Sequence, residues 1–109
     1  MTGEASNAIT EPGLRKLLAK GWHLVVLCHE TPEFRHNHWY GDWSLRITRP
    51  DGAQEHRLVL SRAPYDERRF STLSTVVKFL AKYDFATSHI PLKPGGRTIN
   101  VPPTSWVHD

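Results

Sequence analysis

A hairpin signal between residues 43 and 60 constrains this chain more than any other stretch. From Trp43 to Thr48, apolar and polar residues alternate with the two-residue period of a strand that buries one face. The residues Arg49-Pro50-Asp51-Gly52 follow, and a proline, aspartate and glycine in this order are typical of a tight turn. Alternation resumes from Gln54 to Leu60, where His56, Leu58 and Leu60 share one side and Glu55, Arg57 and Val59 the other. The pattern predicts an antiparallel β-hairpin.

One amphipathic helix is predicted after the hairpin, from Phe70 to Tyr83. Ser71 is the expected N-cap, and apolar residues then recur at helical three-and-four spacing at Leu73, Val76, Val77 and Leu80. The opposite face is polar and basic, with Ser74, Thr75, Lys78 and Lys82. We expect the apolar side of this helix to pack on the hairpin residues Trp43, Leu45, Leu58 and Leu60.

The remaining segments complete the predicted architecture. Residues 1–10 are small and polar and predict a mobile arm, and residues 11–21 predict a short helix with Pro12 in its first turn. Residues 22–28 are almost all apolar, which favours a central or doubly covered strand. Residues 29–40 have no period and predict an irregular loop, whereas residues 86–109 predict an extended, proline-rich tail in which residues 98–101 form a short edge strand.

These elements predict a single α+β domain over residues 1–109. Its core, residues 11–85, has the order α-β-β-β-α, with a small antiparallel sheet of three to four strands, one main helix packed on it and a short N-terminal helix. A length of 109 residues suits one modest hydrophobic core. The single cysteine excludes an internal disulfide, and the first residues lack a basic-then-apolar signal segment. We therefore expect a cytoplasmic protein.

Candidate catalytic and metal-binding residues are Cys28, His29, His36, His38 and His56, because thiolate and imidazole are common zinc ligands. Their spacing fits no familiar zinc motif. Cys28 and His29 are adjacent in a strand and therefore point to opposite faces, so they cannot act together as nucleophile and base. The Gly95-Gly96-Arg97 segment lacks the spacing and the lysine of a phosphate-binding loop. We expect no enzyme activity and no cofactor.

Binding is the class of function that the residues favour. The formal charge of +3 permits a nucleic-acid partner. The hairpin presents arginines that could enter a groove of a duplex, and the segment before it offers rings that could stack on bases. The candidate contact residues are Arg35, His36, His38, Trp39, Tyr40, Arg46, Arg49, Arg57, Arg62, Arg68, Arg69 and Trp106. A solvated strand face with ordinary ion pairs to Glu55, Asp66 and Glu67 would explain the same arginines.

A strand, the turn Pro50-Asp51-Gly52, a second strand and the segment Arg69 to Leu80 together resemble a known arrangement. It is the β-hairpin-plus-helix pattern of small accessory proteins of plasmids, conjugative elements and phages. The pattern is also similar in outline to the arm-binding modules of tyrosine recombinases, which implies DNA contact through the sheet. The order helix, three strands, helix is that of double-stranded-RNA-binding domains, but residues 71–75 stand where that family has lysines.

An inhibitor or adaptor that docks on a host protein complex, as anti-CRISPR proteins do, is the alternative function. Trp39, Tyr40, Trp106 and the arginines are residue types enriched at interface hot spots. A homodimer through an exposed edge strand would suit either function. Salt separates the two classes, because phosphate contacts weaken steeply with ionic strength and aromatic protein interfaces do not.

Overall fold

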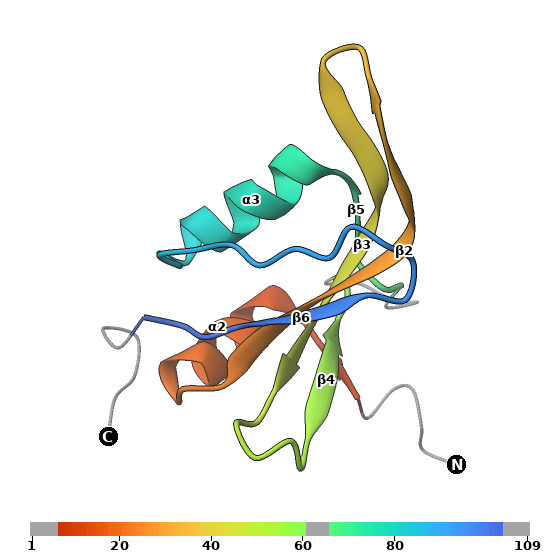
Figure 1. Cartoon of the computed structure of the whole chain (residues 1–109). Coiled ribbons are helices and arrows are strands. Elements are labelled where there is room, and N and C mark those ends of the chain that lie inside the picture. Colours follow the sequence, from red (N-terminus) through yellow and green to blue (C-terminus); the bar gives the residue numbers. More distant parts are fainter. Residues whose placement is uncertain (1–6, 61–65, 104–109) are drawn as a thin grey trace.

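The structure, a computed structural model, describes residues 7–60 and 66–103 of the chain. The elements in chain order are β1 (Ala8–Ile9), α2 (Glu11–Ala19), β2 (His23–Arg35), β3 (His38–Thr48), β4 (Glu55–Leu58), β5 (Arg69–Thr72), α3 (Leu73–Lys82) and β6 (Arg97–Asn100) (Figure 1). The α+β class is confirmed, and so are the short N-terminal helix and the edge strand in the tail. The prediction of a purely antiparallel sheet with three to four strands is wrong, because six strands form one mixed sheet.

The sheet has the order β1-β4-β3-β2-β6, and β5 also pairs with β3. Strand β2 occupies one edge of β3 along its whole length, so β4 and β5 share the other edge one after the other. β4 pairs with residues 46–48 and β5 with residues 40–44 of β3. The parallel pair is β1 with β4, in which Ala8 lies opposite Arg57. Residues 8–9 of the predicted mobile arm are therefore part of the sheet, Thr10 is the N-cap of α2, and residues 1–6 lie outside the described residues.

The predicted irregular loop at residues 29–40 is wrong, because β2 and β3 continue through it as a long hairpin. His36 and Asn37 form its two-residue turn, with φ angles of 52° and 64°, as a type I′ turn requires. Two register shifts between Cys28 and Glu33 interrupt the pairing, and bulges of this kind erase a regular alternation. Figure 1 shows the hairpin tip projecting beyond the rest of the sheet. With both faces largely exposed there, no hydrophobic period marks the strands.

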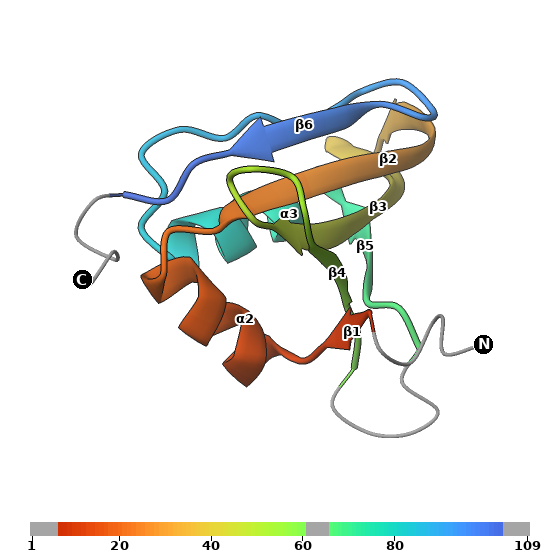
Figure 2. The same cartoon turned by 90° about the horizontal axis from the view of Figure 1, so that it is seen from below.

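Both helices pack on the same face of the sheet (Figure 2). The core between them combines Leu14 and Leu18 of α2, Val76, Phe79 and Leu80 of α3, and Leu24, Val26, Trp43, Leu45, Ile47 and Leu58 of the sheet. The predicted central strand is confirmed, because β2 lies between β3 and β6 and residues 24–26 are fully buried. Val25 belongs to the opposite face, so both sides of this strand exclude solvent.

The main helix differs from its prediction at its start, and the end of the hairpin differs at Leu60. The helix begins at Leu73 with Thr72 as N-cap, because Ser71 belongs to β5. Leu60 is 48% exposed, whereas Val59 is buried. Strand β4 ends at Leu58, and Val59 then forms its own bridge with Glu67, so the two-residue alternation stops there.

Trp43 connects the sheet to the tail and restricts its close neighbour Gly41. The indole is fully buried, and its Nε1 donates a hydrogen bond of 2.9 Å to the carbonyl oxygen of Pro91. A Cβ atom on Gly41 would lie 2.7 Å from the Trp43 ring, which is inside van der Waals contact. Because the ring is held on all sides, it has little room to move away.

The substitution Gly41→Ala should therefore lower the free energy of unfolding by about 1–3 kcal/mol through overpacking. Urea denaturation followed by circular dichroism measures the loss. The same substitution made together with Trp43→Phe should cost less, because the smaller ring leaves space for the methyl group, and the double-mutant cycle isolates this contact. Equal losses in the two backgrounds would show that the ring is not the obstacle.

Candidate nucleic-acid interface

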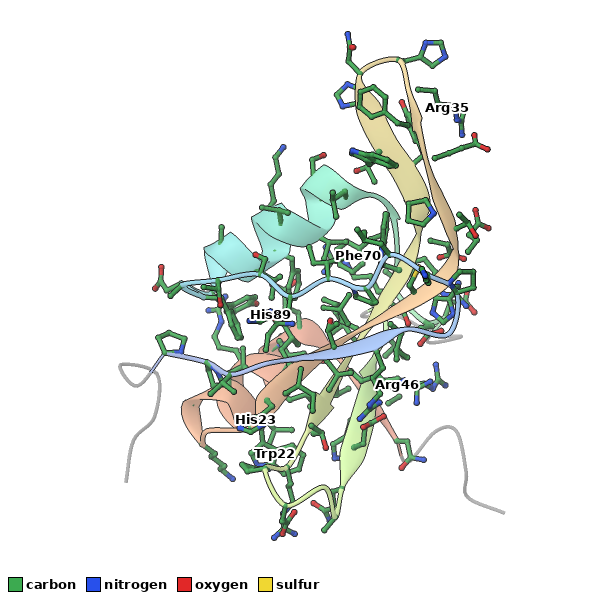
Figure 3. All side chains as sticks on the ribbon, in the orientation of Figure 1. Trp22, His23, Arg35, Arg46, Phe70 and His89 are labelled. Carbon is green, nitrogen blue, oxygen red and sulfur yellow. The ribbon has the colours of Figure 1, made fainter. Side chains whose placement is uncertain are left out.

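The structure divides the predicted contact residues among three places. Arg35, His36, His38, Trp39 and Tyr40 lie in the projecting part of the β2–β3 hairpin, and Arg46, Arg49 and Arg57 lie around β3 and β4. Arg68 and Arg69 lie at β5, beside α3. Figure 3 shows Arg35 near the hairpin tip and Arg46 on the far part of the sheet. Arg62 and Trp106 lie outside the described residues.

Arginines on the helix-free face of the sheet converge on one carboxylate. Arg46 and Arg57 lie opposite each other in the β3–β4 pair. The Glu55 carboxylate accepts hydrogen bonds from Arg46, at 3.3 Å, and from Arg97 of β6, at 2.5 Å. The hydrogen bond from Arg97 outweighs the opposing effect of desolvation and lowers the pKa of Glu55. These side chains carry three positive charges and one negative charge, so this face is basic, as the hairpin pattern indicates.

Aromatic rings gather in the projecting part of the hairpin. Phe34 and Trp39 lie directly opposite each other, with ring centroids 5.2 Å apart, and are 57% and 47% exposed. On the same hairpin, the Arg35 guanidinium lies 4.5 Å from the centroid of the Tyr40 ring and forms an ion pair with Glu33. Rings of this size usually contribute to a core. Their exposure here makes the hairpin a candidate contact surface.

A basic pocket lies between β5 and the outer side of α3. Its cations are Arg68, Arg69, Lys78 and Lys82, and its hydroxyl groups are those of Ser71 and Thr75. Arg69 forms ion pairs with Asp42 and Glu67, and Arg68 forms one with Glu11. Lys78 forms no ion pair with any residue in 7–60 or 66–103. This lysine is therefore available to an anionic ligand.

A second, mostly apolar groove adjoins the basic pocket at Lys78, which lines both. It runs from the hairpin to the helix and is lined by Asn37, His38, Trp39, Leu73, Ser74, Val77 and Lys78. We call the two hollows together the α3 groove. Residues 74 and 82 are eight positions apart in the helix, which corresponds to about 12 Å at 1.5 Å per residue. The α3 groove thus presents apolar surface at one end and cations at the other.

Glu11 is the carboxylate that pairs with two cations of the basic pocket. Its carboxylate, at the start of α2, accepts hydrogen bonds from Arg68 at 2.9 Å, from Lys82 at 2.6 Å and from the Tyr83 hydroxyl. Desolvation by itself raises the pKa of Glu11, but the hydrogen bonds from Lys82, Tyr83 and Arg68 together outweigh it and lower the pKa to about 2. Glu11 is therefore ionised at neutral pH, and it forms ion pairs with two of the pocket's four cations, Arg68 and Lys82.

Cys28 and His29, two of the candidate catalytic residues, lie on opposite faces of β2. Cys28 is buried, and desolvation raises the pKa of its thiol, which donates a hydrogen bond to the Glu30 carbonyl. His29 points to the opposite face, where its Nε2 lies 2.7 Å from Ser44 Oγ. Ser44 is fully buried, so this hydrogen bond lies inside the protein. Among residues 7–60 and 66–103, no three potential ligands are grouped to hold a metal ion.

Sequence reasoning missed several residues that shape these surfaces. Lys78 and Lys82 were recognised only as the solvated side of a helix, and neither Glu11 nor Arg97 was a candidate. Their partners are distant in sequence: Arg97 meets Glu55 across 42 positions and Glu11 meets Lys82 across 71. The sequence does contain one signal. Arg68 and Arg69 directly precede a helix whose polar face carries Lys78 and Lys82, and this proximity indicates one basic surface.

Comparisons with protein-family models, with curated proteins and with solved structures find no match to this chain. The resemblance to accessory proteins of mobile elements stays a prediction. Within the described residues, no helix has the length and apolar character needed to cross a membrane. The class that fold and surface define is an α+β protein with a one-sided helical layer, a projecting aromatic hairpin and a basic groove.

Proposed function

We propose that this protein binds single-stranded nucleic acid along the α3 groove, without catalysing a reaction on it. The observation that carries the proposal is the position of Lys78, which lines both the basic pocket and the groove beside Trp39. Proteins that bind single strands combine cations for the backbone with aromatic rings for the bases. Here both kinds of group meet along one helix.

Phosphate groups would bind at the basic end of the groove. Lys78 supplies an ammonium group that has no ion-pair partner among residues 7–60 and 66–103, and the exposed Ser71 supplies a hydroxyl donor. The hydroxyl group of Thr75 already donates to the Thr72 carbonyl and can only accept. A guanidinium group has five N–H donors. Arg68 and Arg69 use some of them for their carboxylate partners and keep the others for a ligand. The pocket can therefore neutralise a phosphate while its internal ion pairs persist.

Bases would stack at the hairpin end. Trp39 has nearly half of its surface exposed, and Phe34 opposite it holds the indole by a tilted ring contact. A base could lie on the free face of the indole, with Val77 of α3 as the apolar floor of the groove. Stacking on an aromatic ring contributes about 1–3 kcal/mol per base and tolerates any sequence.

The helix-free face of the sheet, with Arg46 and Arg57, is a weaker candidate for the primary site. Its charge is basic, but Glu55 already binds two of its three arginines. Ile99 of β6 is the large apolar side chain exposed on this face. It is aliphatic and offers no ring on which a base could stack. This surface suits phosphate contacts of a longer strand that continues from the groove.

The test is fluorescence anisotropy of labelled single- and double-stranded DNA and RNA at low and at physiological salt. We expect single strands to bind more tightly, with an affinity that falls steeply as salt rises. Trp39→Ala should weaken binding by about 5- to 150-fold, equivalent to one stacked base at about 1–3 kcal/mol. Lys78→Ala should weaken binding to all sequences and reduce the salt slope by about one phosphate contact.

The matched control is the double variant Arg46→Ala with Arg57→Ala on the other face of the sheet. It should change the affinity for a short oligonucleotide much less than Lys78→Ala does. If the double variant abolishes binding and Lys78→Ala does not, the sheet face is the reader and the groove proposal is wrong. Absence of binding to any of the four nucleic acids at low salt would overturn nucleic-acid recognition altogether.

A second candidate function is docking on a larger protein complex through the projecting hairpin. The exposed pair Phe34 and Trp39 favours it, because large rings clustered on a protruding element are typical hot-spot anchors. This reading expects capture of a protein partner that Trp39→Ala abolishes and that raised salt leaves nearly unchanged.

A further inference from the structure

The outer edge of β6 is an open strand edge of the described sheet, although the side chains of Thr98 and Asn100 bind the backbone of His89. Within the described residues, β6 pairs only with β2, so its other side bears no strand. At the opposite end of the sheet, β1 is two residues long, and such short edges resist further pairing. β6 has four residues, and its register with β2 runs without a shift from Arg97 to Asn100.

The hydrogen-bond pattern shows which backbone groups of β6 face outward. The Cys28 N–H donates to the Gly96 carbonyl, so the even-numbered residues of β2 bond toward β6. Their partners in the register are Thr98 and Asn100. Because N–H and C=O directions alternate along a strand, those of Arg97 and Ile99 point away from β2. Among residues 7–60 and 66–103, these outward groups have no backbone partner.

The projecting part of β2, on the same side of the sheet, is protected in ways that β6 is not. It carries Pro32, the charged residues Glu30, Glu33 and Arg35, and two register shifts, all of which discourage edge pairing. β6 instead exposes Ile99 and, just after it, Val101, which are 51% and 64% accessible. Its one charged side chain, Arg97, is held by Glu55 of the same chain.

We propose that two copies of this chain associate through their β6 edges, in antiparallel orientation about a two-fold axis perpendicular to the sheet. Residues opposite each other in such a pair lie on the same face. Placing Ile99 opposite Ile99 of the second copy satisfies this condition and sets Arg97 opposite Val101 and Thr98 opposite Asn100. In this register no arginine faces another arginine, and the outward N–H and C=O groups of both Ile99 residues bond to each other. The edge is thus self-complementary.

The two sheets then form one continuous sheet with both helix-free faces on the same side. This arrangement does not use the α3 groove, because no residue of β6 lines either of its two hollows. The dimer is therefore independent of the proposed nucleic-acid site, and each can be tested without the other.

Light scattering coupled to size exclusion, from micromolar to near-millimolar protein, tests the association. The molar mass should rise with concentration toward that of two chains. Ile99→Pro should keep the mass at one chain, because it removes the outward N–H and no bond to β2. Ile99→Thr retains that N–H and the β-branched shape, so it should still dimerise, with a modest loss of affinity.

Two charge variants test the register without touching the strand interior. Val101→Glu should tighten the dimer and Val101→Lys should weaken it, each by about 2- to 30-fold, because two cross-strand pairs with Arg97 change together. A wild-type chain that stays monomeric over the whole concentration range would overturn the proposal. So would a dimer that survives Ile99→Pro, or one that the two Val101 variants affect equally.

Discussion

Trp43→Ala should be the most destabilising single substitution, with a loss of about 3–5 kcal/mol in the free energy of unfolding. The indole is fully buried in the core, it contacts the position of Gly41, and it donates a hydrogen bond to Pro91. Removing it leaves a cavity and an unpaired carbonyl in the tail. The total free energy of unfolding of a domain of this size is about 5–15 kcal/mol, so the variant loses a large part of its stability.

Trp39→Ala is the matched control, because it removes the same side chain from the exposed hairpin tip. Its cost in urea denaturation should stay below about 1 kcal/mol, as is usual for surface positions. Trp43→Phe should fall between the two, since it loses the hydrogen bond to Pro91 and part of the ring but keeps most of the buried volume. Similar losses for the two alanine variants would contradict the assignment of Trp43 to the core and Trp39 to the surface.

Glu11→Gln should change stability and nucleic-acid affinity in opposite directions. The carboxylate binds Arg68, Lys82 and Tyr83, so its neutral amide analogue should lower the free energy of unfolding by about 1–3 kcal/mol. The same change releases Arg68 and Lys82 to a phosphate ligand, so affinity for a single strand should increase. A matched control is Asp51→Asn, which removes the exposed partner of Arg49 in the hairpin turn and should alter neither quantity appreciably.

The pH dependence of unfolding gives an independent readout of Glu11. Its pKa is about 2 in the folded protein, below the ordinary value of 4.5, so ionisation stabilises the fold. This contribution is fully present above about pH 4.5 and is lost as pH falls toward 2. The wild type should therefore lose more stability than Glu11→Gln between pH 5 and 2, as thermal unfolding across this range would measure. Parallel pH profiles would show that Glu11 is not held by its three partners.

Local patterns predicted the elements that are half buried. The turn at residues 49–52, the strand before it and the helices over residues 11–19 and 73–82 all follow from periodicity and from turn or capping residues. The edge strand predicted at residues 98–101 is observed one residue earlier, at residues 97–100. Each of these signals depends on neighbours within a few positions, so a single sequence contains it.

The projecting hairpin escaped prediction for a physical reason. Burial of one face creates a two-residue alternation, and beyond Cys28 the strands leave the core, so nothing selects which side is apolar. The register shifts add a further break. Backbone pairing closed by the His36–Asn37 turn maintains this part of the sheet, together with exposed contacts such as Phe34 with Trp39. Neither contribution requires a two-residue alternation of apolar and polar side chains.

The sequence by itself determined the class of the fold, the two helices, the hairpin of β3 and β4, and the basic, aromatic character of the surface. Only the tertiary structure decided which of these groups meet. It brought Lys78 beside Trp39, tied Glu11 to Lys82 and Arg97 to Glu55, and separated Arg46 from the hairpin rings. Such encounters depend on how distant strands pair and how helices lie across them. That geometry is set by long-range packing, which no local pattern records.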